Sequence, residues 1–185
     1  MKVAIITGAS VGIGSSTAQT FLNEGFTVFN LARRQCAIDG VTSLRCDLSS
    51  QTSIDTACDT LKKALADCSE ATLIHNASQM KKDSAGDCSS DSLNQVMATN
   101  VIAVNSLNQH LLPLMPASSS VLYIGSTLSE KAVPGSFSYV ISKHAQLGMM
   151  RATCQDLMGS GLHTAMICPG FTDTEMLRTH LGSDP

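Results

Sequence analysis

The residues of this chain best suited to acid–base chemistry are a tyrosine and a lysine four positions apart, Tyr139 and Lys143 in the segment YVISK. Ser126 lies thirteen residues before the tyrosine. Positions i and i+4 of a helix share one face, so the lysine ammonium is expected to lie near the phenol. Together these side chains predict transfer of a proton to or from an oxygen atom of a bound molecule.

A tyrosine phenol must become more acidic before it can transfer a proton at neutral pH. Lowering its pKa from about 10 to about 7 takes roughly 4 kcal/mol. One positive charge about 4 Å away supplies on the order of 4 kcal/mol at an effective dielectric constant near 20. The charge of Lys143, helped by a second positive charge on a bound molecule, is therefore expected to lower the pKa of Tyr139 far enough for catalysis.

A glycine-rich turn, TGASVGIG, follows the first apolar run of the chain. Gly8 lets the backbone turn sharply, and Gly12 and Gly14 leave room for a pyrophosphate beside the start of a helix. The unpaired N–H groups and the dipole of that helix then face the anion. Such a glycine pattern is weak alone, and a plain strand–helix turn is the alternative. Its place between the first strand and first helix of an alternating chain favours a dinucleotide site.

The residues after the second apolar run, NLARR, indicate which dinucleotide is bound. Ala32 stands where an aspartate would grip the ribose 2′-hydroxyl of NAD, and Arg33 follows it. A missing carboxylate beside an arginine suits a 2′-phosphate, so NADP(H) is favoured and NAD(H) is the alternative. Solvation of a strand end by Arg33 and Arg34 is the other interpretation.

Two further polar positions follow predicted strands. Asp47 can accept a hydrogen bond from an adenine amino group, and the backbone of Asn76 and Ala77 would run along the cofactor. Asp47 and Asn76 are equally common as turn or capping residues.

Strand-like and helix-like segments alternate along the chain. Apolar, β-branched runs predict strands at 2–7, 27–31, 43–46, 72–75, 121–125 and 164–168. Helical periodicity and end signals predict helices at 15–24, 53–66, 91–112 and 137–158. This alternation predicts a single α/β domain over 1–185, with a Rossmann-type, doubly wound parallel sheet covered by helices on both faces. Ligands of such sheets bind at the carboxyl ends of the strands.

Composition excludes several classes of partner. The net charge of -3 and the absence of a basic run argue against nucleic acid and against an anionic membrane surface. The apolar run at the N-terminus is too short for a signal peptide or a membrane span. Seven cysteines without a C-x-x-C pair favour reduced thiols and a cytoplasmic location. The five histidines show no metal-ligand spacing, so no metal site is predicted.

Taken together, the motifs resemble those of the short-chain dehydrogenase/reductase family. The segments that carry the resemblance are TGASVGIG, HNAS, MATNVIAV with Asn100, the serine at 126, YVISK and PGFTDT, in the family's order and spacing. The match extends from Lys2 to Thr174. It implies an NAD(P)-dependent oxidoreductase acting on the CH–OH or C=O group of a small molecule.

The resemblance also implies a role for each catalytic position. Tyr139 would be the general acid in carbonyl reduction and the base in alcohol oxidation, and Lys143 would lower its pKa and bind the nicotinamide ribose. Ser126 would hold and polarise the substrate oxygen, and Asn100 would place a water that continues a proton relay behind Lys143. A turn hydroxyl, a satisfied core amide and a surface helix pair are the alternatives for these residues taken singly. The cofactor contacts implied are Gly8, Ser10, Gly12, Ile13, Gly14, Arg33, Asp47, Leu48, Asn76, Ala77, Tyr139, Lys143, Pro169, Gly170 and Thr172.

The chain departs from the family pattern in two places. Ser78 stands where the family usually has glycine, which adds a side chain close to the ribose. The sequence also stops where family members normally continue, which implies an incomplete substrate lid and no usual last edge strand. A fragment, a lost tail and a minimal family member all fit that ending.

Apolar residues on several faces of the helices at 91–112 and 137–158 suggest subunit contact. Family members commonly dimerise through this pair, so a homodimer or homotetramer is expected, with packing inside the monomer as the alternative. Two rival functions remain open: a dinucleotide-binding regulatory or redox-sensing protein without turnover, and an inactive fragment.

Overall fold

Six parallel strands form one sheet in the order β3-β2-β1-β4-β5-β6. The computed structural model describes residues 1–182. The strands are β1 (Lys2–Thr7), β2 (Thr27–Ala32), β3 (Val41–Arg45), β4 (Glu70–His75), β5 (Ser120–Ile124) and β6 (His163–Ile167). Strand order reverses between β1 and β4, and a crevice for ligands opens at such a reversal. The predicted doubly wound parallel sheet is confirmed.

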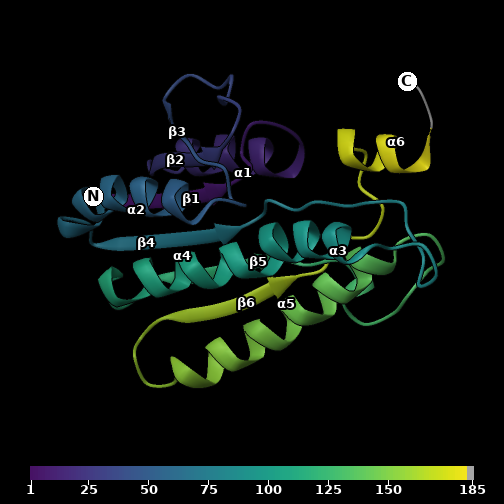
Figure 1. Ribbon diagram of the computed structural model, residues 1–185. Helices are drawn as coiled ribbons and strands as arrows, with labels where there is room; N and C mark the ends of the chain where they lie inside the picture. The colour runs from purple at the N-terminus through teal and green to yellow at the C-terminus, as the bar shows by residue number, and fades with distance from the viewer. Residues whose placement is uncertain (183–185) are drawn as a thin grey trace.

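Helices cover both faces of the sheet (Figure 1). They are α1 (Gly12–Asn23), α2 (Gln51–Ala66), α3 (Ser90–Met97), α4 (Ala103–Leu111), α5 (Phe137–Asp156) and α6 (Glu175–Leu181). Alternate residues of β1 point to opposite faces: Val3 and Ile5 pack in the core with residues of α2 and α4, whereas Ala4 and Ile6 pack with α1. A strand covered on both faces is apolar throughout, which is why β1 could be located from sequence.

The helix predicted at 91–112 is interrupted. The segment Ala98–Ile102 between α3 and α4 is π-helical, and it contains the buried Asn100. One extra residue in a helical turn leaves no mark on the apolar pattern, and such bulges gather at functional sites. α6 was not predicted either, because seven residues are too few to show a helical period. The N-cap residue of α6, Thr174, is of a type that the sequence could have revealed. Its side chain accepts a hydrogen bond from the Leu177 N–H at 3.3 Å.

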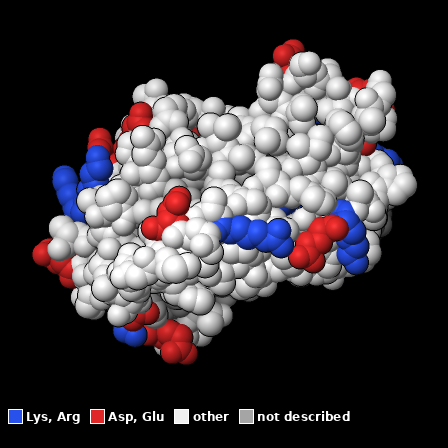
Figure 2. All heavy atoms as spheres, turned by 90° about the horizontal axis from the view of Figure 1, so that it is seen from below, with Lys and Arg blue, Asp and Glu red and all other residues white. Residues whose placement is uncertain are grey.

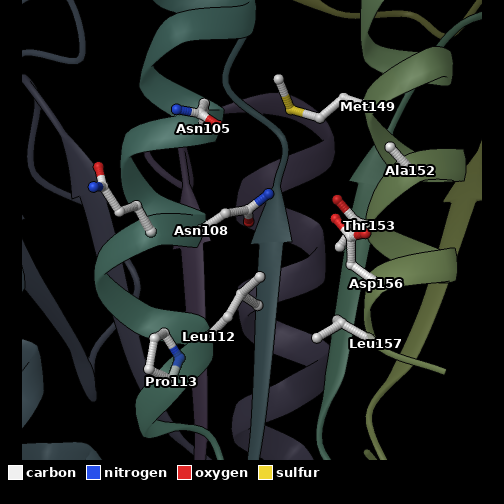
Figure 3. Close-up of a pocket in the computed structure, with 10 residues that line it drawn as sticks. Asn105, Asn108, Leu112, Pro113, Met149, Ala152, Thr153, Asp156 and Leu157 are labelled. Carbon is white, nitrogen blue, oxygen red and sulfur yellow. The ribbon is translucent and has the colours of Figure 1, made fainter. Parts of the chain in front are cut away.

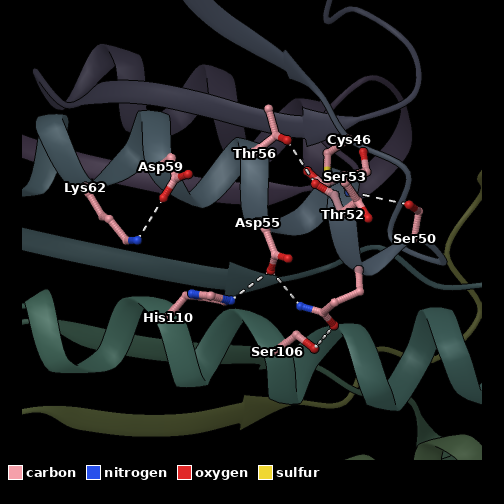
Figure 4. Close-up of polar contacts among 11 residues, drawn as sticks. Cys46, Ser50, Thr52, Ser53, Asp55, Thr56, Asp59, Lys62, Ser106 and His110 are labelled. Carbon is pink, nitrogen blue, oxygen red and sulfur yellow. Dashed lines mark hydrogen bonds and ion pairs between the residues drawn. The ribbon is translucent and has the colours of Figure 1, made fainter.

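Polar side chains join α2 to α4 at the rim of their apolar contact (Figure 4). His110 Nε2 lies 3.0 Å from Asp55 Oδ1, and the Ser106 hydroxyl donates to Gln51 Oε1 at 2.8 Å. Ser106 is buried, so its hydroxyl needs this partner. These contacts set how the two helices lie together, whereas the apolar residues beneath them supply most of the packing energy.

The last strand in sequence lies at an edge of the sheet. Among the described residues β6 pairs with β5 alone, and α5 packs against it. Its end is open to solvent, with the Ile167 residue 52% exposed. The prediction of β6 as an uncovered edge is therefore confirmed for the described residues.

On the face of the molecule in Figure 2, the lysine and arginine side chains are scattered among acidic and uncharged residues. A continuous basic stripe, the usual footprint of a nucleic-acid site, does not appear on that face. Among residues 1–182, no helix combines the length and the apolar character needed to cross a membrane.

A chain of buried polar groups runs through the core between β4, α4, β5 and α5. His75 Nε2 lies 2.8 Å from Asn108 Oδ1, Asn108 Nδ2 donates to the Tyr123 hydroxyl at 2.8 Å, and that hydroxyl lies 3.0 Å from Thr153 Oγ1. Burial lowers the pKa of His75 from 6.5 to about 4, while the hydrogen bond to Asn108 opposes the change. The core therefore holds a neutral imidazole down to acidic pH.

We predict that His75 makes the protein lose stability in mild acid. Below pH about 6.5 the unfolded chain protonates this imidazole while the folded chain does not, so acid favours unfolding. Between pH 7 and pH 5 the contribution of His75 is a loss of about 2 kcal/mol. Urea unfolding at the two pH values measures it, and His75→Asn should show a smaller loss than the parent.

The control is His163→Asn, which changes an exposed histidine and should keep the parent's dependence on pH. An equal loss of stability in the parent and in His75→Asn would contradict the prediction.

Candidate active site

The glycine turn lies at the carboxyl end of β1, packed against the segment that follows β4. Gly8 has a φ of +70°, and a Cβ there would approach the Ala77 Cα to 3.1 Å. A Cβ on Gly14 would overlap the Gly8 carbonyl oxygen and come within 3.0 Å of the Ala9 Cα. Glycine is therefore required at both positions by backbone packing, and the turn presents the N-terminus of α1 to the crevice.

Hydrogen bonds hold this turn to the segment after β4. The Thr7 hydroxyl accepts from the N–H groups of Asn76 and Ala77 at 3.0 and 2.9 Å. Asn76 Nδ2 donates to the carbonyls of Thr7 and Gly8 at 2.9 and 3.1 Å. Asn76, predicted as a cofactor contact, thus also builds the turn.

Asn30 on β2 supports the turn from beneath, and we did not predict its role. Its Oδ1 accepts from the Ala9 N–H at 2.8 Å, and its Nδ2 donates to the Ser43 hydroxyl at 3.1 Å. An amide inside the apolar run TVFNL was the available signal, because a fully buried amide must find partners.

A hollow of about 490 Å³ lies over the first turns of α1. Residues from the turn, from α1 and from the segment before α6 line it: Gly12, Ile13, Ser15, Ser16, Thr17, Thr20, Thr172, Asp173 and Thr174. Three predicted cofactor contacts, Gly12, Ile13 and Thr172, therefore share one cavity, whereas Ser10 lies in the turn just before it. Free N–H groups at the start of a helix suit a pyrophosphate in this position.

The end of β2 faces the segment after β3. Arg33 is exposed, and its charge acts on Asp47. Hydrogen bonds from the side chain and backbone of Ser49 are the largest causes of the lowered pKa of Asp47, and the charge of Arg33 adds to them. Asp47 therefore has the geometry of a turn residue, the alternative left open by the sequence. Leu48 packs its side chain against the core, which leaves its backbone for a cofactor.

Tyr139 and Lys143 lie on one buried face of α5, as their spacing predicted. The tyrosine residue is 8% exposed and the lysine 1%, and the Lys143 Nζ lies 5.4 Å from the centre of the tyrosine ring. The N-terminus of the helix is fixed from a distant loop, because the Asp83 carboxylate accepts from the Ser138 N–H at 3.0 Å.

Burial is the main influence on the ionisation of this pair. Burial raises the pKa of Tyr139, and the nearby hydroxyls of Ser126 and Ser78 oppose the rise. Burial also lowers the pKa of Lys143 to about 8. Removal from water disfavours the phenolate, and the ammonium donates its hydrogen bonds to Ile124 and Gln146. The expected lowering of the Tyr139 pKa also requires the charge of an oxidised nicotinamide, and it stays a prediction.

Two serines flank the phenol. Ser126 caps the short helical turn Thr127–Ser129, and its hydroxyl accepts from the Leu128 N–H at 3.1 Å. The Ser78 hydroxyl is buried and makes no hydrogen bond of good geometry among the described residues, yet it lies close enough to the Tyr139 phenol to oppose the rise of its pKa. The residue that departs from the family glycine thus lies beside Tyr139.

Asn100 holds the segment after β4 in place. Its Oδ1 accepts from the Gln79 N–H at 2.7 Å, and its Nδ2 donates to the Gln79 carbonyl at 2.9 Å and to the Ser142 hydroxyl at 2.9 Å. Its main-chain carbonyl accepts from the Gln146 side chain at 2.6 Å. The π-helical segment therefore joins the loop after β4 to α5.

The segment after β6 completes the edge of the crevice. The Thr127 N–H donates to the Pro169 carbonyl at 3.1 Å, and the Thr172 hydroxyl donates to the Gly170 carbonyl at 3.3 Å. Pro169 therefore lies beside the turn that begins at Ser126. The predicted positions from β1, β4, β5, α5 and β6 all gather at the carboxyl edge of the sheet.

Comparison with known proteins identifies the family. A model of the short chain dehydrogenases matches residues 2–182. The chain belongs to the short chain dehydrogenase family. Its predicted class, an NAD(P)-dependent oxidoreductase acting on alcohol or carbonyl groups, is confirmed by relatives that are themselves named dehydrogenases and reductases.

Individual relatives of this short chain dehydrogenase are distant in sequence. It is 26% identical to short chain aldehyde dehydrogenase 1 of Euphorbia lathyris, over 98% of this chain and 67% of that protein. It is 27% identical to the mitochondrial borneol dehydrogenase of Lavandula x intermedia, over 96% and 71%. Its structure resembles that of ligand-free Thermoplasma acidophilum aldohexose dehydrogenase, with a TM-score of 0.90 and 25% identity, over 100% and 73% of the two chains.

Other side chains that build this dehydrogenase site were not predicted. Gln79, Ser142 and Gln146 each hydrogen-bond a predicted residue, and Asp83 holds the backbone of Ser138 next to Tyr139. Ser142 and Gln146 carried a signal, since they lie three residues after Tyr139 and Lys143 and so share the buried face of α5. Gln79 and Asp83 reach the site from the loop after β4, where sequence spacing says nothing about distance.

We predict that Gly14→Ala opens the glycine turn and destabilises the fold by about 1–3 kcal/mol, because the new methyl group would overlap the Gly8 carbonyl. Denaturant unfolding measures the change. The matched control is Gly148→Ala in α5, where a Cβ meets nothing within 4 Å. That variant should gain up to about 1 kcal/mol from helix propensity. Equal stability of Gly14→Ala and the parent would contradict the packing argument.

Proposed function

We propose that this short chain dehydrogenase transfers hydride between NADP(H) and a small carbonyl or alcohol substrate, with Tyr139 as general acid or base. The observation that carries the proposal is the meeting of Tyr139, Lys143 and Ser126 on the sheet edge that also bears the glycine turn. A proton-transfer group and a phosphate-binding turn on one edge match a reaction in which a hydride and a proton reach the same C=O group.

The bound dinucleotide supplies the hydride, and the protein supplies position and the proton. Ser126 lies beside the phenol, so a carbonyl oxygen held between the two hydroxyls is polarised by both. Tyr139 then gives its proton to that oxygen, and it takes the proton back in alcohol oxidation. Because burial raises the phenol pKa, a positive charge nearby is required for both the acid role and the base role.

Lys143 provides that charge. Its ammonium lies under the phenol ring and has a pKa of about 8, so it remains mainly protonated at neutral pH. The same position allows it to reach the ribose next to the nicotinamide, which Pro169, Gly170 and Thr172 would border. Asn100 fixes the loop that closes this end of the crevice.

Arg33 favours NADP(H) over NAD(H). It follows Ala32 at the end of β2, where no carboxylate of that strand end is available to bind a ribose 2′-hydroxyl. An exposed guanidinium beside Asp47 suits a 2′-phosphate. A 4-hydroxyisoleucine dehydrogenase complexed with NADH shares the fold at 23% identity. Such a likeness concerns the fold alone, so the residues after β2 decide our choice.

We also propose a homodimer or homotetramer that uses the outer faces of α3–α4 and α5. A hollow of about 390 Å³ lies between α4 and α5, with Met149, Ala152 and Leu157 on one wall and Leu112 and Pro113 on the other (Figure 3). Part of the apolar surface that the sequence indicated on these helices packs inside the monomer, because four of its residues are buried: Val96, Val104, Leu107 and Leu111. Ile102, 57% exposed, remains for a subunit contact.

A dinucleotide-binding protein without turnover is the second candidate. The Ser78 hydroxyl beside Tyr139 favours it, since a side chain in the place of glycine narrows the space for the ribose and substrate.

For either function we propose the cytoplasm as the location. The seven free cysteines suit a reducing compartment.

We predict that Tyr139→Phe abolishes reduction of ketones and aldehydes. Loss of the general acid should lower the rate of NADPH oxidation at least about 100-fold. The dissociation constant of NADPH should stay close to the parent's, because the phenol hydroxyl is not part of the phosphate site. NADPH absorbance and a fluorescence titration measure the two quantities.

The two readouts separate the candidates. NADPH binding without turnover in the parent itself favours the regulatory protein, and undiminished turnover in Tyr139→Phe contradicts the assigned role of the phenol.

We predict that Arg33→Ala weakens NADPH binding about 10- to 100-fold, which corresponds to the loss of roughly 1.5–3 kcal/mol from a charge-assisted hydrogen bond. NADH binding should change little, because NADH carries no 2′-phosphate. The matched control is Arg34→Ala, since Arg34 lies 3.3 Å from Glu175 in an ion pair and is directed toward α6. Equal losses for NADPH and NADH in Arg33→Ala would contradict the NADP assignment.

A further inference from the structure

Gln146 forms a bridge behind the reactive lysine. Its Oε1 accepts from Lys143 Nζ at 2.9 Å, and its Nε2 donates to the main-chain carbonyl of Asn100 at 2.6 Å. Lys143 Nζ also donates to the Ile124 carbonyl at 2.8 Å. The ammonium is thus held by β5 on one side and, through one amide, by the π-helical segment on the other.

The bridge is buried and its orientation is set by its partners. Gln146 is 1% exposed, and Asn100 and Lys143 are 0% and 1% exposed. An ammonium only donates and a carbonyl only accepts, so the amide must turn its oxygen to Lys143 and its nitrogen to Asn100. A flipped amide would place two donors face to face and two acceptors face to face.

An amide in this position supports the ammonium without passing protons along. With contacts of 2.9 and 2.6 Å on its two sides, no water fits between the amide and either partner. Neither amide atom gains or loses a proton near neutral pH, unlike the carboxylates and imidazoles that relay protons. Its effect on the reaction must therefore act through the place and the charge of Lys143.

We propose that Gln146 is a positioning residue of the active site, whose side-chain amide fixes the Lys143 ammonium beneath Tyr139 and sets the pH at which Lys143 loses its charge. The role of Lys143 in turnover rests on the proposed function. The link between Gln146 and Lys143 does not, because it is a contact within the folded chain.

Few titratable groups other than Lys143 itself lie near the contact between Gln146 and the Lys143 ammonium. Tyr139 on α5 and Cys168 after β6 face the Lys143 ammonium among the described residues, and the nearby groups of β5 and the π-helical segment are uncharged. Burial lowers the pKa of Lys143 to about 8, and Cys168 opposes that change. An acceptor beside a buried ammonium favours its charged form.

The test is a titration of Lys143 that does not depend on activity. The whole protein, labelled with ¹³C at lysine Cε, is followed by NMR from pH 6 to pH 11, and Lys143→Met assigns the signal. We expect a midpoint near pH 8 in the parent. Gln146→Glu should raise it by about 1–3 units, because a carboxylate replaces the amide, and Gln146→Leu should lower it by about one unit.

Gln155→Leu is the matched control, because it removes an exposed glutamine of the same helix and should leave the Lys143 midpoint unchanged. Circular dichroism establishes that each variant is folded, and Gln146→Glu still tests the link if the leucine variant does not fold. A Lys143 midpoint that stays at the parent's value in the folded Gln146 variants overturns the proposal.

Turnover separates this link from the proposed function. Reduction should fall as pH rises through the Lys143 midpoint, since loss of the ammonium leaves Tyr139 a weaker acid, and this limb should move with the NMR midpoint in each variant. Shifted midpoints in a protein without turnover overturn the proposed function and leave the link standing. If the Lys143 midpoint shifts in a variant but the pH at which reduction declines stays at the parent's value, the catalytic part of the inference is overturned.

Discussion

Burial of the Lys143 ammonium is the constraint on which the reactive end of this molecule depends. A charge with 1% exposure must find acceptors, and the chain supplies a carbonyl from β5 and an amide from α5. Those acceptors are themselves held by their neighbours, so β5, α5 and the π-helical segment between α3 and α4 can meet in only one arrangement. The position of the lysine beneath Tyr139 is thereby set by contacts within the chain.

A different constraint shapes the phosphate end. Here the backbone of the turn after β1 approaches the segment after β4 so closely that two glycines are required, and Thr7 and Asn76 join the two segments with four hydrogen bonds. The strand order reverses at this pair of strands. One tight contact therefore forms the turn at the edge of the crevice. The same segment continues from Asn76 to Ser78, whose hydroxyl lies near the Tyr139 phenol.

Much of the fold was readable from the chain because its signals are local. Continuous apolar runs located the six strands to within a few residues, and helix periodicity located α2 and α5. Gly8, Gly14, Tyr139 and Lys143 were found because their chemistry is fixed by residue type and by spacing along one element. Family membership, now supported by the match over residues 2–182, followed from the same short motifs.

The tertiary structure decided what depends on neighbours from distant parts of the chain. The π-helical turn at Asn100, the short helix α6 and the support given by Asn30 and Asp83 come from contacts between segments whose separation in sequence carries no distance information. Ionisation is of the same kind: spacing placed the Lys143 charge near the Tyr139 phenol, but burial raised the phenol pKa and turned the ammonium toward Ile124 and Gln146. The sequence by itself determined the fold and the candidate catalytic side chains, because residue type and period are local properties. Only the folded structure determined their environment, since solvation and hydrogen-bond partners belong to the assembled core.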